Sequence, residues 1–407
     1  MLEFTTFTLS SGLRVVHCPT NGAISNFGVV IDCGSRDETD AESGLAHFIE
    51  HTIFKGTQKR KAYHVLNRLD SVGGEINAYT GKEDTAIHSS FLNEYYERAI
   101  ELTADILFNS SFPEKEIEKE KEVVIDEINS YLDSPSEQIF DDFEEQIFKG
   151  HPLANPILGS KQSVRSFKKT DIQQFIDKHY GINNMVLCSA GKINLKSLKR
   201  LLEKYFGHFT KEVELKNRKI PFAYQASHKE SEKKTNQAHF ILGSTAPNLF
   251  QENRPAVGLL NNILGGPGLN SHLNLYIREK YGIAYNIESH YTPYIDTGSF
   301  FIYLGTDFDQ LKRSIRLING VLGKLRNKKL GTLQLHQAKK QLIGHIALNQ
   351  ESNSSNMLNL AKSLLIFNKI ESDEEVYRRI YSITSEEVLE AANLILDPKQ
   401  LSSLTYL

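Results

Sequence analysis

The chain has 407 residues, which is too long for one ordinary hydrophobic core and predicts two or more domains. Its 40% hydrophobic and 24% charged residues are typical of a soluble globular protein, and the net charge of −3 gives no reason to expect nucleic acid or an anionic membrane as a partner. No apolar run reaches the length of a membrane span, so we expect no transmembrane segment.

The N-terminal residues and the cysteines indicate a compartment. Met1–Thr6 lacks both the basic and the apolar region of a signal peptide. We therefore expect a cytoplasmic protein, or a periplasmic one if a leader was removed. The three cysteines, Cys18, Cys33 and Cys188, are scattered and odd in number. That pattern favours buried free thiols in a reducing compartment over a disulfide framework.

The first half of the chain combines strand patterns with amphipathic helices. Alternation over Leu13–His17 predicts a strand, and Gly74–Tyr79 begins a second strand-like stretch. A helix is predicted from Glu94 to Leu107. A further helical run, Glu114–Ile128, is rich in Glu/Lys pairs of the kind that stabilise a solvated helix face.

The second half repeats this order. Gly282–Asn286 begins a strand-like stretch, Ser299–Tyr303 alternates as a strand, and Phe308–Leu322 predicts a helix. The offset from the first half is roughly 200 residues, which indicates one internal duplication and not a short-period array. The predicted fold class is α+β, with two homologous domains of α/β layers. We place them at residues 1–210 and 235–407, joined by a charged linker at 211–234 that contains Ile220-Pro221-Phe222.

The segment His47-Phe48-Ile49-Glu50-His51 carries the chemistry. At about 100° per residue, His47 and His51 lie about 40° apart on a helical wheel, and Glu50 lies about 60° to the other side of His47. The opposite half of the wheel is apolar: Leu45, Phe48, Ile49 and Ile53. Two neutral imidazoles at i, i+4 can bind one Zn²⁺, and a carboxylate that is not a ligand can take a proton from the attacking water. The order His-x-x-Glu-His is the inverzincin form. On this motif alone, a helix whose polar face happens to carry two histidines remains an alternative.

A second acidic pair lies on the helical run that follows. Glu120 and Glu127 are seven residues apart and share one stripe of the helix with Val124 and Tyr131. A carboxylate within an apolar stripe needs a partner, and a Zn²⁺ held by two histidines lacks a third protein ligand. One of the two acids can supply it. The alternative is a partly exposed helix with both acids in water.

Blocks along the whole chain carry a family resemblance. In the first half they are Gly34–Glu38, Gly44–His51, Phe54–Thr57, Asn77–Thr80 with Glu83 and Thr85, Val123–Ile128, His151–Leu153, Pro156–Gly159, and Tyr180 with Asn184–Leu187 and Gly191. In the second half they are Gly265–Gly266, Arg278–Lys280 and Gly282–Tyr285. In these blocks the chain resembles the pitrilysin/insulinase (M16) family of zinc peptidases, which includes the mitochondrial processing peptidase. It is most similar to the short, two-domain bacterial-type members.

The resemblance implies roles for the first-half residues. His47 and His51 match the two histidine ligands of the zinc, and Glu127 matches the third ligand. Glu50 matches the general base, and Glu120 matches a supporting acid.

The resemblance also implies how substrate is held. Asn77, Ala78 and Tyr79 match the edge strand with which an extended peptide pairs. Arg278 and Tyr285 match a pair that reaches the zinc site from the other half of a clamshell. Because this chain corresponds to half of the family's clamshell, the resemblance implies a second subunit, identical or a related one, and a closed dimeric chamber.

The expected function is therefore a zinc-dependent endopeptidase with one Zn²⁺ per chain and unstructured peptides as substrates. Two alternatives stay open. One is a protease that removes leader or targeting peptides by the same chemistry. The other is a non-catalytic scaffold subunit of the same family. Such non-catalytic relatives typically lose zinc ligands or the base.

Overall fold

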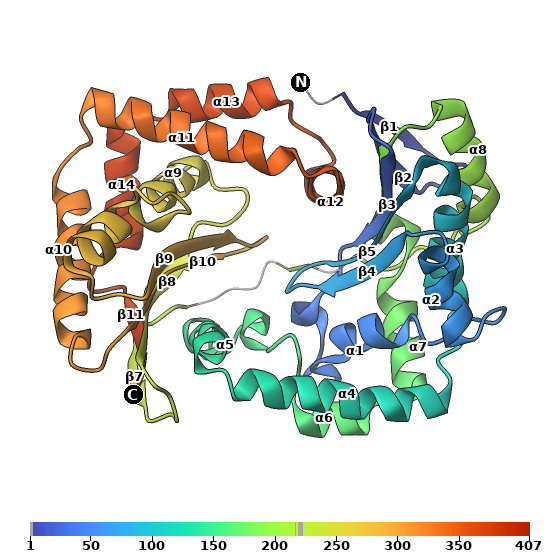
Figure 1. Ribbon diagram of the computed structural model, residues 1–407, viewed down its shortest axis with the longest axis horizontal. Helices are drawn as coiled ribbons and strands as arrows, with labels where there is room; N and C mark the ends of the chain where they lie inside the picture. Colours follow the sequence, from blue (N-terminus) through green and yellow to red (C-terminus); the bar gives the residue numbers. More distant parts are fainter. Residues whose placement is uncertain (1–2, 216, 219–222) are drawn as a thin grey trace. The chain divides into compact units, whose positions relative to one another are not determined.

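The computed structural model describes residues 3–215, 217–218 and 223–407, which divide into two compact units (Figure 1). Unit 1 comprises Met1–Ile128, Asn155–Lys216 and Leu348–Asp373. Unit 2 comprises Asn129–Ala154, Asn217–Ala347 and Glu374–Leu407. Neither unit is therefore continuous along the chain.

Unit 1 is built on a six-stranded mixed sheet in the order β1-β2-β6-β3-β5-β4. The strands are β1 (Thr5–Thr8), β2 (Arg14–Pro19), β3 (Ile24–Ile31), β4 (Glu75–Thr80), β5 (Thr85–Leu92) and β6 (Met185–Gly191). β2 and β6 are parallel, and the other pairs are antiparallel. β3 and β6 are almost wholly buried, as expected for strands whose two faces are both covered.

One face of this sheet is covered by helices from the first half of the sequence. They are α1 (Leu45–Thr52), α2 (Ala62–Asp70), α3 (Tyr96–Asn109), α4 (Glu114–Leu132), α6 (Lys161–Ser166), α7 (Lys169–His179) and α8 (Leu195–Phe206). Short 3₁₀ turns link them at Ser35–Asp37, Asp40–Glu42, Asn93–Tyr95 and Ile182–Asn184. Inward side chains of alternating strand positions, such as Val15, Val29 and Leu187, join this core.

The other face of the same sheet is covered by α12 (Asn353–Phe367), which comes from the second half of the sequence. Met357, Ala361 and Leu364 of α12 pack against Val16 and Val186 of the sheet. Figure 1 shows α12 beside β2 and β3. Unit 1 thus needs a segment from each half of the chain to bury both faces of its sheet.

Unit 2 has a five-stranded sheet in the order β7-β11-β8-β10-β9. The strands are β7 (His228–Ser231), β8 (Ala238–Ala246), β9 (Asn286–Pro293), β10 (Gly298–Thr306) and β11 (Ser402–Tyr406). The order and directions match β2-β6-β3-β5-β4, including one parallel pair, β7 with β11. The fold class is therefore α+β with two sheets, as predicted.

The helices of unit 2 repeat the pattern of unit 1. One sheet face packs against α9 (Arg254–Gly265), the π-helical segment η6 (Asn274–Glu279), α10 (Leu311–Asn327) and α14 (Ser385–Ile395), joined by α11 (Thr332–Gln350). The other face packs against α5 (Pro135–Ile147), from the first half of the sequence, followed by the 3₁₀ turn Pro152–Ala154. The remaining helix is α13 (Asp373–Ser382). α5 and α12 hold equivalent places in the two element orders, so the halves exchange one helix each.

The sequence-based elements are present with shifted ends. The helices expected at Glu94–Leu107 and Phe308–Leu322 are α3 and α10, and all three cysteines are buried. The expected linker differs: its end, His228–Ser231, forms β7, while Ile220-Pro221-Phe222 lies outside the described residues. The division into homologous halves at 1–210 and 235–407 stays a prediction. The two compact units are defined by spatial contacts, and each contains segments from both halves of the sequence. Within the described ranges, no helix combines the length and apolarity that crossing a bilayer requires.

Candidate active site

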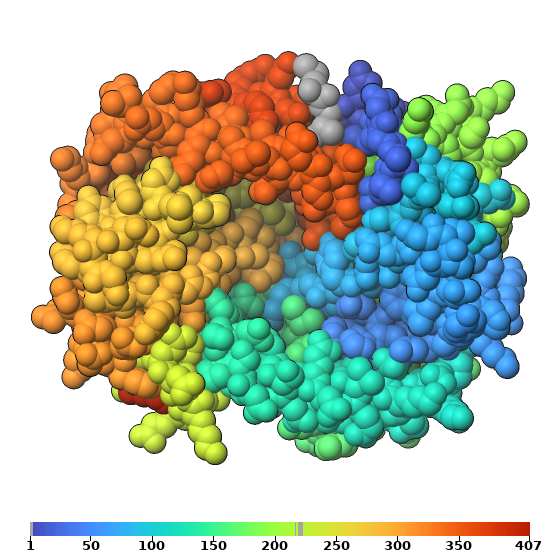
Figure 2. Space-filling view, in the orientation of Figure 1, coloured from blue at the N-terminus to red at the C-terminus, as the bar shows by residue number. Residues whose placement is uncertain are grey.

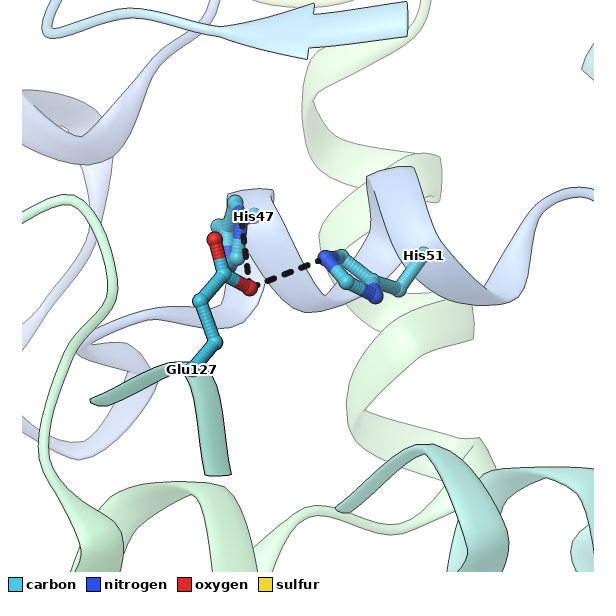
Figure 3. A group of neighbouring side chains, drawn as sticks. All are labelled: His47, His51 and Glu127. Atoms are coloured by element: carbon cyan, nitrogen blue, oxygen red, sulfur yellow. Dashed lines mark ion pairs between the residues drawn. The ribbon is translucent and has the colours of Figure 1, made fainter. Parts of the chain in front are cut away.

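α1 and α4 bring three possible metal ligands together in unit 1. Glu127 Oε2 lies 3.8 Å from His47 Nε2 and 3.4 Å from His51 Nε2 (Figure 3). Two ligands each about 2 Å from one ion at tetrahedral angles are about 3.3 Å apart, so the separation of Glu127 from His51 is close to this value and its separation from His47 is somewhat longer. Among the described residues, these three are the group of His, Cys, Asp or Glu side chains that lie close enough together to hold a metal ion.

The back of α1 fixes the direction of its two histidines. Leu45, Phe48 and Ile49 are fully buried in the unit 1 core, as the helical wheel predicted. Because the apolar half of the helix is held by packing, the imidazoles face away from the core toward α4.

The start of α1 is held by the buried carboxyl group of Glu38 and by two glycines. Glu38 accepts hydrogen bonds from the backbone N–H groups of Gly44 (2.8 Å) and Ala46 (2.7 Å), which takes the place of an N-cap. Burial raises the pKa of Glu38 to about 8. Gly44 has φ +89°, and a Cβ there would lie 2.6 Å from the Leu158 carbonyl oxygen and 2.8 Å from Gly159 Cα. The first turn of α1 therefore tolerates only glycine at this contact.

The two histidines have different surroundings. Burial, with a smaller contribution from the neighbouring His51, lowers the pKa of His47 to about 4, so His47 stays neutral near pH 7. A hydrogen bond to Glu120 raises the pKa of His51, against the effect of burial. A neutral imidazole is the form that binds a metal, so His47 is already in its ligand state.

Glu120 lies behind His51 as a supporting acid. Its Oε2 lies 3.3 Å from His51 Nδ1, and its Oε1 lies 2.6 Å from Lys55 Nζ. Burial acts to raise the pKa of Glu120, but the hydrogen bonds from His51 and Lys55 outweigh it and lower the pKa. With Nδ1–H donating to Glu120, the lone pair of His51 Nε2 faces Glu127. Sequence reasoning gave no role to Lys55, which lies four residues after His51 and beyond the end of α1.

Glu50 is held by the end of β4. Thr80 Oγ1 donates a hydrogen bond of 2.7 Å to Glu50 Oε2. Burial raises the pKa of Glu50, an effect that the hydrogen bond from Thr80 and the charge of His51 reduce. A carboxylate with a raised pKa beside a metal group suits a general base. Thr80 was part of the matching block, but its partner is 30 residues away in sequence and no pattern pairs them.

The substrate segment predicted at Asn77, Ala78 and Tyr79 lies in β4, an edge strand whose partner among the described strands is β5. Ala78 packs toward the core that contains α1, whereas Tyr79 faces the α12 side. The Tyr79 hydroxyl donates to Asp84 (3.2 Å), and Lys362 of α12 lies 5.1 Å from the centre of its ring. The Tyr79 side chain thus anchors the strand, while the strand's outer edge offers backbone groups.

Arg278 and Tyr285 belong to unit 2. Arg278 lies on the π-helical segment η6, and Tyr285 precedes β9; both are exposed. The Tyr285 hydroxyl donates to Asp307 (3.0 Å), and this hydrogen bond raises its pKa. His47, His51, Glu50, Glu120 and Glu127 therefore meet within unit 1, and the Arg/Tyr pair is carried by the other unit.

His151 is buried, and its Nε2 lies 3.1 Å from Asp296 Oδ2. Within the described part of the chain, the other histidines singled out for comparison do not join a metal group. These are His88, His272 and His290.

The chain resembles known proteins in sequence and in fold. A family profile described as "Insulinase (Peptidase family M16)" matches residues 14–161, and one described as "Peptidase M16 inactive domain" matches residues 166–342. The chain is 33% identical to "Uncharacterized zinc protease YmxG" of Bacillus subtilis, over 94% of this chain and 93% of that protein. It is 31% identical to an "Uncharacterized zinc protease" of Rickettsia bellii, over 99% and 97%. "The crystal structure of a protease from Helicobacter pylori" shares the fold, with a TM-score of 0.89 over 100% of this chain and 99% of that one, at 22% identity.

Proposed function

Because the chain belongs to the insulinase family, peptidase family M16, we propose that it is a zinc-dependent endopeptidase that hydrolyses unstructured peptides. The observation that carries the proposal is the convergence of His47, His51 and Glu127, with Glu50 on the same helix face. Relatives that span nearly the whole chain and are named zinc proteases support it.

His47, His51 and Glu127 would hold one zinc ion per chain. The ion would supply Lewis acidity, which polarises the scissile carbonyl and lowers the pKa of the attacking water. Glu50 takes the proton of that water and returns it to the leaving amine. Glu120 fixes the ring of His51 through Nδ1, and Lys55 partly offsets the acidic charge around the site.

Peptide binding would use the edge of β4. An extended peptide can pair with the backbone groups of Asn77–Tyr79 that β5 leaves unpaired, which requires a substrate without fixed structure. Glu127 is 44% exposed at its side chain, so solvent and substrate can reach the metal group. Figure 2 shows the outer surface of α4, in teal, along the lower edge of the view.

The experiment is hydrolysis of a quenched unstructured peptide by wild type and by Glu50→Gln, with zinc content measured on both. The proposal predicts about one zinc per chain, cleavage by wild type and none by the variant. Zinc in both proteins with cleavage by neither, over a broad set of peptides, would favour the scaffold alternative. A leader-processing enzyme would cleave at one site of a leader peptide and leave the general peptides intact.

We further propose that the active form is a homodimer in which Arg278 and Tyr285 act on the partner's zinc site. One chain carries both the metal group and the Arg/Tyr pair, so an identical partner completes both sites by symmetry. His51→Ala mixed with an Arg278→Ala/Tyr285→Phe double variant, at equal amounts and full exchange, should then recover about a quarter of wild-type activity. Subunits that demonstrably exchange and recover nothing would count against action in trans.

A further inference from the structure

Thr80 connects the edge strand of unit 1 to the carboxylate of Glu50. It is the last residue of β4, and its Oγ1 donates to Glu50 Oε2 at 2.7 Å. Alternation along β4 places Thr80 on the face of Ile76 and Ala78, which pack against the core that contains α1.

The position of Thr80 is set by its own turn and not by Glu50. Ser35 N–H donates to the Gly81 carbonyl (3.1 Å), and Arg36 N–H donates to the Lys82 carbonyl (2.9 Å). Arg36 also pairs with Glu83, which fixes the turn from the side of the 34–38 loop.

α12 and the 155 segment hold the same turn. Lys362 Nζ lies 2.8 Å from Asp84 Oδ2, and Lys82 Nζ donates to the Asn155 carbonyl at 2.7 Å. A turn held at this many points cannot follow a mobile side chain. The hydrogen bond therefore restrains the Glu50 carboxylate and leaves the strand where it is.

We propose that Thr80 is a positioning residue for the general base: the hydrogen bond from its hydroxyl fixes Glu50 relative to the strand with which substrate pairs. This inference rests on the proposed function of Glu50. A glutamate has rotatable bonds that cost conformational entropy to restrain, and a hydroxyl anchored on a rigid turn restrains them before substrate arrives. Because a peptide paired with β4 takes its register from the same strand, Thr80 links the place of the scissile bond to the place of the base.

The chain offers a matched control in the same turn. Thr85 lies directly opposite Thr80 in the β4–β5 ladder, and its Oγ1 donates to the Cys33 carbonyl at 2.8 Å. Thr85→Val therefore removes a threonine hydroxyl from the same hairpin without touching Glu50. Thr80→Ser keeps the hydroxyl, whereas Thr80→Val removes it at nearly constant volume.

The first test is steady-state cleavage of the quenched peptide by the zinc-loaded variants. Thr80→Val should lose about 10-fold or more in kcat, the size of effect that outer hydrogen-bond partners of active-site groups produce. KM and zinc content should stay close to those of wild type. Thr80→Ser should recover most of kcat, and Thr85→Val should keep wild-type kcat. Equal kcat in Thr80→Val and wild type, or equal losses in both valine variants, would overturn the proposal.

The second test needs no activity. The urea midpoints of the zinc-free wild type, Thr80→Val, Glu50→Ala and the double variant form a double-mutant cycle. If the hydrogen bond exists in solution, the two single shifts will not add up to the shift of the double variant. Additive shifts would overturn the inference whether or not the protein is a peptidase. If the cycle shows coupling but the protein cleaves no peptide, the proposed function is refuted while the hydrogen bond between Thr80 and Glu50 is supported.

Discussion

The glycine at the start of α1 gives a prediction that separates backbone conformation from packing. Gly44 and Gly73 both have positive φ, +89° and +73°. An alanine Cβ at Gly73 would meet nothing within 4 Å, whereas at Gly44 it would lie 2.6 Å from the Leu158 carbonyl oxygen. Gly73→Ala should therefore cost only the left-handed conformation, about 1–2 kcal/mol.

Gly44→Ala adds a backbone overlap to the same conformational cost. Overpacking typically costs a further 1–3 kcal/mol, so the total is about 2–5 kcal/mol. Relief requires α1 to move away from the Leu158–Gly159 backbone, and this shifts His47, three residues into the helix. Gly44→Ala should therefore also weaken zinc binding, while Gly73→Ala should not. Urea unfolding of the zinc-free proteins and zinc competition with a chelator measure the two effects. Equal costs for the two variants, or unchanged zinc affinity in Gly44→Ala, would refute this account of how α1 is held.

Three further predictions concern charge and the exchanged helix. The pKa of Glu38 is about 8 in the folded protein and about 4.3 in an unfolded chain, so the stability that protonated Glu38 contributes is complete below about pH 4.3 and is lost as pH rises through about 8. The urea midpoint of the zinc-free wild type should fall over this pH range, and that of Glu38→Gln should fall less. Lys55→Met leaves the Glu120 carboxylate, 8% exposed, without its cation and should destabilise the zinc-free protein by about 1–3 kcal/mol; adding Glu120→Gln should recover part of the loss, and no recovery would show that Lys55 acts elsewhere. Met357→Ala, in the α12 contact with the unit 1 sheet, should cost about 2–5 kcal/mol, whereas Leu348→Ala, 70% exposed, should change the urea midpoint little.

α1, which carries His47 and His51, could be predicted because the pattern that determines it lies within one short segment of the sequence. An apolar half-wheel and a polar half-wheel over Leu45–Ile53 determine both that the segment is a helix and which way His47 and His51 face. Glu127 could be proposed because zinc requires a third ligand and because the resemblance pointed to this acid. Thr80 and Lys55 could not be assigned in this way, because each meets its partner through tertiary contacts across 30 and 65 residues of chain.

The exchange of α5 and α12 shows a different limit. An amphipathic pattern states that a helix has an apolar face, but it does not state which sheet that face covers. α5 follows the long helix α4 in the first half, and α12 follows the long helix α11 at the equivalent place in the second half. The sequence therefore suggested two self-contained halves. β7 escaped notice because its four residues are mostly exposed and lie in a charged stretch, so that only its pairing with β11 identifies it as a strand.

The two units share a topology, yet over the described residues the candidate metal group lies in unit 1 and unit 2 has no counterpart. In unit 2, α9 holds the place that α1 holds in unit 1, between the first inner strand and the hairpin that ends at the sheet edge. Its sequence there is apolar, with Leu259, Leu260 and Ile263 in the core and no imidazole. In unit 2 this helix therefore serves packing alone. The edge strand of unit 2, β9, still has an open edge with which a peptide can pair. A unit with the architecture of the metal-binding unit but without its ligands can bind or position a peptide without cleaving it. This difference between two copies of one topology is consistent with Tyr285 lying directly before β9 and Arg278 lying on η6, the element that precedes β9.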